Sequence, residues 1–121
     1  MVSAGCCASD GHVVWGHMFS SCKVPIVLGH EGAGVIESVG EDITDLKVGD
    51  HVLTNIMSQC GDCKLCTNEL TNCCETQGFR TMSDVVTKRL DNEQGTDVYN
   101  FVGLGVFSEY CLLRKSQIVK V

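Results

Sequence analysis

The chain has 121 residues, which is enough for one domain with a single modest core. Its formal net charge is −6 and its Lys and Arg residues are scattered, which argues against nucleic acid or an anionic membrane as the main partner. No apolar run approaches the roughly 20 residues of a membrane helix. The start of the chain lacks the pattern of a signal peptide, so we expect a cytoplasmic protein with free or metal-bound cysteines.

The part of the chain before the cysteine-rich run is predicted to form a short turn followed by several strands. Residues 9–12 predict a turn or one short helical turn. Apolar residues between 24 and 39 predict strands, with Pro25 at the edge of the first run, where its missing N–H is tolerable. An acidic, turn-rich stretch over residues 40–50 leads to another short strand at residues 51–54.

The strongest chemical signal is a run of closely spaced cysteines that begins at residue 60. Four thiolates satisfy the tetrahedral preference of Zn²⁺, and a Cys-x-x-Cys spacing lets two of them converge on one ion. We therefore predict a closed, structural four-cysteine zinc site in a lobe of about 58–76. From spacing alone, either of two adjacent cysteines could supply the fourth ligand. The cysteines of this run are Cys60, Cys63, Cys66, Cys73 and Cys74.

Three other kinds of cysteine chemistry fit part of this pattern. A disulfide framework is disfavoured because the chain has nine cysteines, an odd number, and no secretory segment opens it. A redox Cys-x-x-Cys needs only two cysteines and leaves the others unexplained. An iron–sulfur cluster uses the same ligand at similar spacing, so it is the real competitor to zinc.

The C-terminal part alternates between polar and apolar character. Residues 76–98 have no clear period, and we expect a long surface excursion there. Apolar residues return from Tyr99 to Val121, where two or three closing strands are expected. Short strands, thirteen glycines and little helical pattern together predict a mainly β fold, a small barrel.

A second constellation of chemical groups lies in residues 7–12 and 29–34. The thiol of Cys7, the imidazole of His30 and the hydroxyl of Ser9 could form part of a catalytic zinc site, which leaves one coordination position open. Taken alone, this signal is weak, because a lone Cys or His is more often a buried core residue. The glycines of residues 29–34 have the wrong spacing for a dinucleotide fingerprint.

Together, these stretches resemble the zinc-containing, medium-chain alcohol dehydrogenases, and the animal enzymes in particular, over nearly the whole chain. The family's pattern is Cys-x-Ser/Thr-Asp, Gly-His-Glu-x-x-Gly, a Val-Gly-Asp turn and four closely spaced cysteines. Matching segments stand at 7–10, 29–34, 48–50 and 60–74. The resemblance implies a GroES-like, partly open β-barrel with a four-cysteine zinc lobe, one catalytic domain over residues 1–121 that is truncated at both ends.

The resemblance also implies roles for individual residues. Cys7 and His30 match two ligands of the catalytic zinc. Ser9 matches the hydroxyl that passes on the substrate proton, and His12 matches the outer end of that relay, beside the cofactor. Asp10 and Glu31 match carboxylates that orient a ligand histidine. For the structural site, the family's seven-residue gap selects Cys74 over Cys73.

The departures from the family pattern shape the expected function. The family's third catalytic ligand is a cysteine beyond the closing strands, Cys111 is not at the matching place, and we expect a Rossmann domain for NAD to be absent. We therefore expect a weak or empty catalytic zinc position, unless Cys6, Cys22 or another group completes it.

The resemblance implies a zinc- and NAD-dependent dehydrogenase that oxidises an alcohol to an aldehyde or ketone. Small alcohols or aldehydes are the expected substrates and the family's enzymes are dimers. The chain is expected to be inactive alone. The alternatives are a truncated isoform, a non-catalytic zinc-binding module, and a co-chaperonin-like barrel that rests on fold analogy alone.

Overall fold

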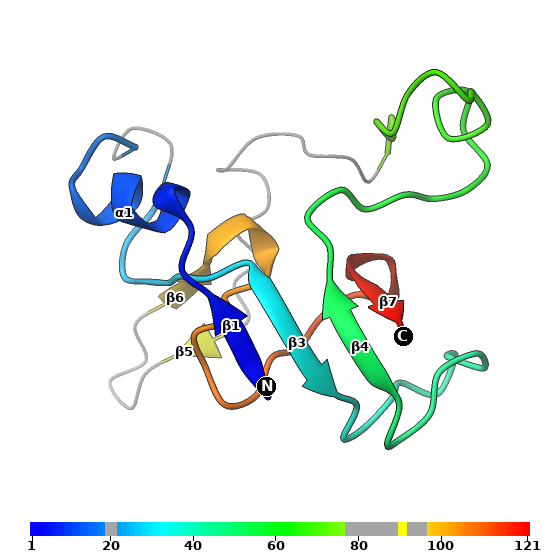
Figure 1. Ribbon diagram of the computed structural model, residues 1–121, viewed down its shortest axis with the longest axis horizontal. Coiled ribbons are helices and arrows are strands. Elements are labelled where there is room, and N and C mark those ends of the chain that lie inside the picture. Colours follow the sequence, from blue (N-terminus) through cyan, green and yellow to red (C-terminus); the bar gives the residue numbers. More distant parts are fainter. Residues whose placement is uncertain (19–21, 77–89, 92–96) are drawn as a thin grey trace.

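The computed structural model describes residues 1–18, 22–76, 90–91 and 97–121, and a four-stranded antiparallel sheet forms its centre (Figure 1). The strand order is β1-β3-β4-β7. Because side chains alternate across a strand, Val52 of β4 faces the core while its neighbour Leu53 is 46% exposed on the outer face. The strands are β1 (Ser3–Gly5), β3 (Glu31–Val35), β4 (His51–Thr54) and β7 (Ile118–Lys120).

A smaller sheet has the strand order β2-β6-β5. Its strands are β2 (Ile26–Val27), β5 (Leu90–Asp91) and β6 (Asp97–Asn100). β2 runs parallel to β6 and pairs Ile26 with Tyr99, whereas β5 runs antiparallel to β6. The mainly β fold is confirmed, although the strands within the described ranges form two sheets and no closed barrel. Most of the excursion expected over residues 76–98 falls outside those ranges.

The turn predicted over residues 9–12 is a longer element, the helix α1 (Ala8–Val14). The predicted short helical turn lies inside it, but Gly11 and the β-branched Val13 and Val14 are poor helix formers, so the sequence pattern did not indicate its full length. The helix depends on its N-terminal cap instead, where the Asp10 carboxylate accepts the backbone N–H of Cys7 at 3.1 Å. Among the described residues, no helix is long and apolar enough to cross a membrane.

The apolar run after β6 differs from the expected strands. Phe101–Gly103 forms the 3₁₀ helix η1, and no strand covers residues 110–113. Positive φ angles of 47° at Val102, 74° at Gly103 and 60° at Gly105 turn the backbone out of an extended path. This run still forms the core, because Phe101, Leu104 and Val106 are each at most 1% exposed. Of the expected closing strands, β7 forms, after the 3₁₀ helix η2 (Lys115–Gln117), whereas β6 ends at Asn100, before the apolar run begins.

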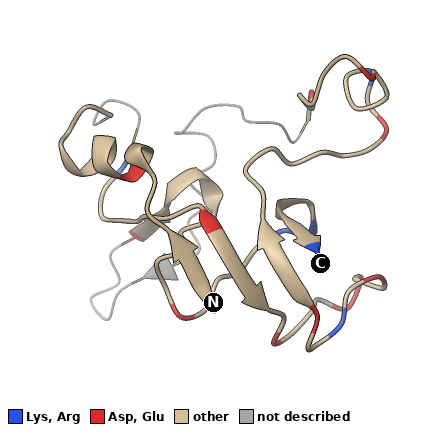
Figure 2. Ribbon diagram, in the orientation of Figure 1, with Lys and Arg blue, Asp and Glu red and all other residues tan. Residues whose placement is uncertain are grey.

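The acidic loop between β3 and β4 is tied to the C-terminal segment. Figure 2 shows acidic residues along this loop and basic ones near the C-terminus. Lys115 Nζ lies 2.8 Å from Asp45 Oδ2, and Lys120 Nζ lies 2.9 Å from Asp50 Oδ2. These ion pairs connect β7 and its preceding turn to the loop that leads into β4.

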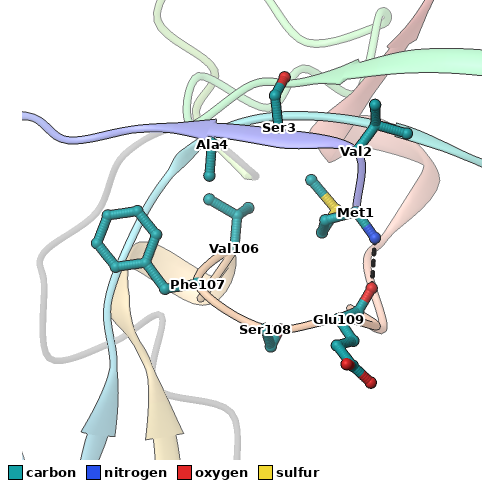
Figure 3. A pocket seen from close by; sticks show the side chains of 8 residues that line it. All are labelled: Met1, Val2, Ser3, Ala4, Val106, Phe107, Ser108 and Glu109. Atoms are coloured by element: carbon teal, nitrogen blue, oxygen red, sulfur yellow. Dashed lines mark hydrogen bonds between the residues drawn. The ribbon is translucent and has the colours of Figure 1, made fainter.

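A groove runs between β1 and the loop over residues 106–109 (Figure 3). Met1 to Ala4 form one wall, and Val106 to Glu109 form the other. The amino group of Met1 donates a hydrogen bond to the Glu109 carbonyl across it. None of the candidate metal ligands lines this groove.

Candidate metal centres

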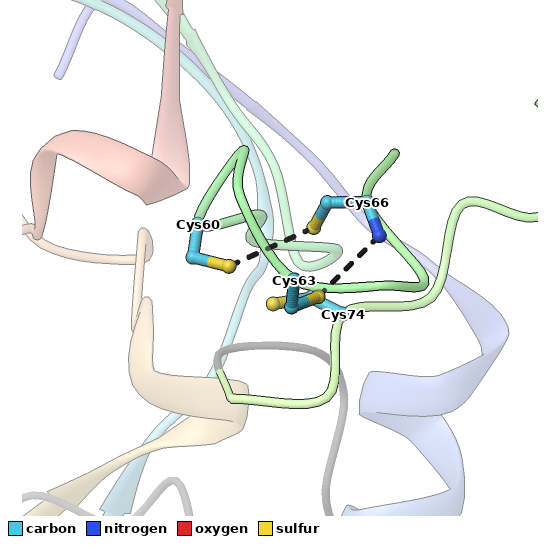
Figure 4. Close-up of side chains that lie close together, drawn as sticks. All are labelled: Cys60, Cys63, Cys66 and Cys74. Carbon is cyan, nitrogen blue, oxygen red and sulfur yellow. Dashed lines mark hydrogen bonds between the residues drawn. The ribbon is translucent and has the colours of Figure 1, made fainter. Parts of the chain in front are cut away.

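Four cysteines of the lobe that follows β4 converge on one point (Figure 4). Their Sγ atoms all lie within 4.8 Å of one another. Cys73 is exposed and does not join them, so the structure brings together the set that the family pattern selects. In Figure 1 this loop extends beyond the end of β4, away from the strands. The four residues are Cys60, Cys63, Cys66 and Cys74.

The sulfur positions fit a tetrahedral zinc ion. Zn–S bonds of about 2.3 Å give a tetrahedron whose sulfur–sulfur edges are about 3.8 Å. The Sγ atoms of Cys60 and Cys66 lie 3.9 Å apart. A structural site of this kind needs no opening for substrate, and here all four donors come from protein.

Backbone N–H groups and neighbouring thiols give these cysteines different acidities. Hydrogen bonds from the backbone of Glu75 and of Cys66, whose N lies 3.4 Å from the Cys63 sulfur, lower the pKa of Cys63. A backbone hydrogen bond at Gly61 lowers the pKa of Cys66, but burial and the thiols of Cys63 and Cys74 outweigh it and raise that pKa to about 11. Four thiolates therefore do not form together at neutral pH without a cation to compensate their charge.

A second cluster joins the start of α1 to the start of β3. One ligand atom from each of Cys7, His30 and Glu31 lies within 4.8 Å of the others. Cys7 is the N-cap of α1, and β1 pairs with β3 so that Gly5 stands opposite Glu31. The family pattern implies that Glu31 orients a ligand histidine, whereas the structure brings its carboxylate among the ligand atoms.

The His30 ring is held with its two nitrogens in different surroundings. Nε2 lies 3.4 Å from the Ser9 hydroxyl oxygen and 3.8 Å from the Glu31 carboxylate. Nδ1 is buried without a hydrogen-bond partner, 3.8 Å from an oxygen of Asp10. Phe101 meets the ring at a steep angle, with centroids 5.4 Å apart. This arrangement directs Nε2 toward the cluster and leaves Nδ1 beside a carboxylate that can orient it.

Two polar side chains fix the backbone around the cluster. The Asp10 carboxylate is 5% exposed, and besides Cys7 N–H it accepts the N–H of Gly29 at 2.7 Å. The Thr54 hydroxyl donates to the His30 carbonyl at 2.7 Å and accepts the Gly32 N–H at 2.8 Å. Sequence reasoning missed Thr54 and Phe101, since both lie far from His30 along the chain.

His12 stands apart from the other predicted site residues. Its side chain is exposed, and its Nδ1 makes a hydrogen bond with Nδ1 of His17 at 3.0 Å. Ser9, Asp10 and Glu31 surround His30 directly, so three of the four predicted catalytic residues gather at the second cluster.

The comparison with known families covers the whole chain. Residues 1–121 match the family model described as the alcohol dehydrogenase GroES-like domain. The chain belongs to this family. The four-cysteine lobe and the Cys7 cluster both lie within the residues that match this model.

Curated relatives agree with this family. The chain is 42% identical over its full length to a geraniol dehydrogenase of Carpoglyphus lactis, of which it spans 33%. It is 46% identical over 80% of its length to an S-(hydroxymethyl)glutathione dehydrogenase of Saccharomyces cerevisiae, of which it spans 26%. The chain therefore covers about a third or less of these relatives.

Solved structures of the family show the same arrangement of elements. An alcohol dehydrogenase zinc-binding domain protein from Burkholderia ambifaria matches 98% of this chain with a TM-score of 0.74 and 30% identity. Benzyl alcohol dehydrogenase from Acinetobacter calcoaceticus matches 99% with a TM-score of 0.65 and 32% identity. The chain spans 32% of each of these proteins.

Proposed function

We propose that this chain is the catalytic-domain portion of a zinc- and NAD-dependent alcohol dehydrogenase that oxidises small alcohols to aldehydes or ketones in the cytoplasm. The observation that carries the proposal is the second cluster, where Cys7, His30 and Glu31 converge beside the Ser9 hydroxyl. Three protein donors with a position left open are the usual composition of a catalytic zinc site. The relatives are themselves dehydrogenases.

Each residue of the cluster has a proposed task. Zinc held there would act as a Lewis acid that makes an alcohol hydroxyl easier to deprotonate. The Ser9 hydroxyl lies beside the ligand atoms, where it can accept that proton and pass it on. Asp10 holds the two segments that carry Cys7 and His30, and His12 is the proposed outer end of the relay.

The four-cysteine lobe has a structural task in this proposal. Its donors are complete without any outside ligand, so metal binding there stabilises the folded loop and does not activate a substrate. A second candidate function, a zinc-binding module without catalysis, is favoured by the same completeness. The two functions differ in whether the Cys7 cluster supports chemistry.

A chimera distinguishes them. In it, residues 1–121 replace the matching part of the geraniol dehydrogenase of Carpoglyphus lactis, and NADH formation is followed by absorbance after NAD⁺ binding has been verified. The dehydrogenase proposal predicts turnover that is lost in the Cys7→Ser chimera. A chimera that binds NAD⁺ and zinc yet gives no turnover favours the non-catalytic module.

The 121-residue polypeptide alone is proposed to give no turnover of ethanol with NAD⁺. It holds no Gly-x-Gly-x-x-Gly turn, and positioning of the cofactor supplies a large part of the rate in such reactions. NADH absorbance under excess alcohol and zinc is the assay, with the Cys7→Ser protein as control. Sustained turnover that disappears in the control would overturn this part of the proposal.

A further inference from the structure

Three aromatic side chains gather at the C-terminal end of α1. His12 lies in the last turn of the helix, Trp15 is its C-cap residue, and His17 follows two residues later. The ring centroids of His12 and His17 are 5.2 Å apart, and the Trp15 ring lies 6.1 Å from each of them. All three side chains are exposed, so the cluster does not belong to the hydrophobic core.

Two glycines set this cluster in place. Gly16 has a φ of +80°, the left-handed conformation that ends many helices, and its N–H bonds to the Val13 carbonyl at 3.1 Å. The chain therefore turns back, and His17 returns to His12. A Cβ on Gly11 would lie 3.1 Å from the Trp15 ring, so the missing side chain gives the indole its place against the helix.

The two Nδ1 atoms lie 3.0 Å apart, and one of them donates a hydrogen bond to the other. Because both groups are exposed, water can replace this hydrogen bond, and its net contribution to stability is small. The distance also suits shared coordination. Two metal–nitrogen bonds of about 2.1 Å that meet at about 90° separate their nitrogens by about 3.0 Å, whereas a tetrahedral angle gives about 3.4 Å.

We propose that His12 and His17 together bind a divalent transition-metal ion with octahedral or tetragonal preference, of which Ni²⁺ and Cu²⁺ are the representatives. Imidazole nitrogen is a favoured ligand of both ions, and adjacent positions of their coordination sphere are about 90° apart. The proton shared by the two Nδ1 atoms moves through solvent to Nε2 of the ring that carried it, so that both Nδ1 lone pairs bind the ion. The rings turn toward the ion, and water fills the remaining positions. The site stands on its own geometry and does not rest on the proposed function.

The fluorescence of Trp15 reports metal binding at this site, because Trp15 is the only tryptophan of the chain. Ni²⁺ is the probe, since Cu²⁺ would oxidise the cysteine thiols. The protein is first loaded with zinc and freed of excess metal, so that the thiolate cluster is filled. Ni²⁺ bound between the two imidazoles then lies close to the indole and quenches its fluorescence. We expect saturable quenching as Ni²⁺ is titrated.

Three variants decide the assignment. His12→Gln and His17→Gln each remove one donor and should each raise the apparent dissociation constant for Ni²⁺ about tenfold or more. His51→Gln, which changes an exposed histidine on β4, should leave the titration unchanged. The proposal is overturned if the wild-type protein shows no saturable quenching, if either His12→Gln or His17→Gln retains wild-type affinity, or if His51→Gln weakens binding equally.

Discussion

At the scale of single residues, Asp10 holds the second cluster together. Its two carboxylate oxygens accept backbone N–H groups from Cys7 and from Gly29, the residue before His30, so one buried side chain fixes the backbone at both donors. The same carboxylate lies 3.8 Å from Nδ1 of His30. A carboxylate in that position favours the tautomer that leaves Nε2 free to bind a metal ion.

Asp10→Asn is expected to weaken the second cluster selectively. The Asn side chain keeps one acceptor oxygen, but its NH₂ group faces the backbone N–H of Cys7 or of Gly29. That N–H then lacks its acceptor, which costs about 1–3 kcal/mol of stability. We expect zinc affinity at this cluster to fall about 10–100-fold while the four-cysteine site keeps its ion. Titration of zinc against a chromophoric chelator measures the zinc affinity of each of the two sites. The exposed Asp42→Asn variant is the control, and equal losses in both variants would refute the role given to Asp10.

The donor Glu31 leads to a prediction about the strength of this site. It is 55% exposed, so its carboxylate competes with water for any ion, and the cluster should bind zinc far more weakly than the four cysteines do. Glu31→Gln should weaken it further, and the exposed Glu37→Gln should not. Isothermal titration of zinc into metal-free protein tests this. Two equally tight sites would contradict it.

At the scale of elements, the C-terminal strand is attached to the sheet by an ion pair as well as by backbone pairing. Asp50 is buried at the start of β4, and its carboxylate contacts Lys120 of β7 at 2.9 Å. The hydrogen bond from Lys120, followed by one from the backbone N–H of Lys47, lowers the pKa of Asp50. The ion pair therefore links the edge strand to the acidic loop.

The lowered pKa of Asp50 predicts how stability depends on pH. Because the folded pKa lies below the unfolded value of about 3.9, the contribution is complete above that value and is lost as pH falls through the folded pKa. Asp50→Asn should be less stable at neutral pH and should lose less stability on acidification. Urea midpoints between about pH 2 and pH 6 measure this. If the urea midpoint of Asp50→Asn falls with decreasing pH as steeply as that of the wild-type protein, Asp50 is not the group responsible for the loss of stability.

Among the described residues, the irregular run after β6 holds the largest fully buried side chains. Leu104 is fully buried there, so Leu104→Ala should lower the free energy of unfolding by about 2–5 kcal/mol. Leu70→Ala is the matched control, since Leu70 is 93% exposed and should change it by less than about 0.5 kcal/mol. Denaturant unfolding of zinc-loaded protein measures both. Similar values for the two variants would show that this run does not form the core.

At the scale of the whole molecule, the sequence predicted what short-range patterns encode. β4 forms over the predicted residues 51–54, and Val52 is buried there between exposed neighbours, as in a strand with one buried face. The four-cysteine cluster followed from ligand spacing, and the family pattern chose Cys74 over Cys73. The same pattern named Ser9 and Asp10, which the structure places beside His30.

Long-range contacts explain what the sequence did not show. The left-handed backbone at Val102 and Gly105 depends on packing around them, and a Cβ at Gly105 would lie 2.8 Å from the Asn100 side chain. A hydrophobic run alone therefore predicted a strand where η1 forms. Likewise, Thr54 and Phe101 reach His30 only because separate segments meet in the fold.

The central claim, that this GroES-like domain folds around a zinc ion held by four cysteines, is tested most directly by metal analysis after mild chelation. Wild-type protein should retain one zinc ion per chain, and Cys63→Ser should lose it because a ligand is removed. Cys73→Ser, which changes the neighbouring exposed thiol, should keep the ion. A Cys63→Ser protein that still holds a full equivalent, or a Cys73→Ser protein that does not, would contradict the account.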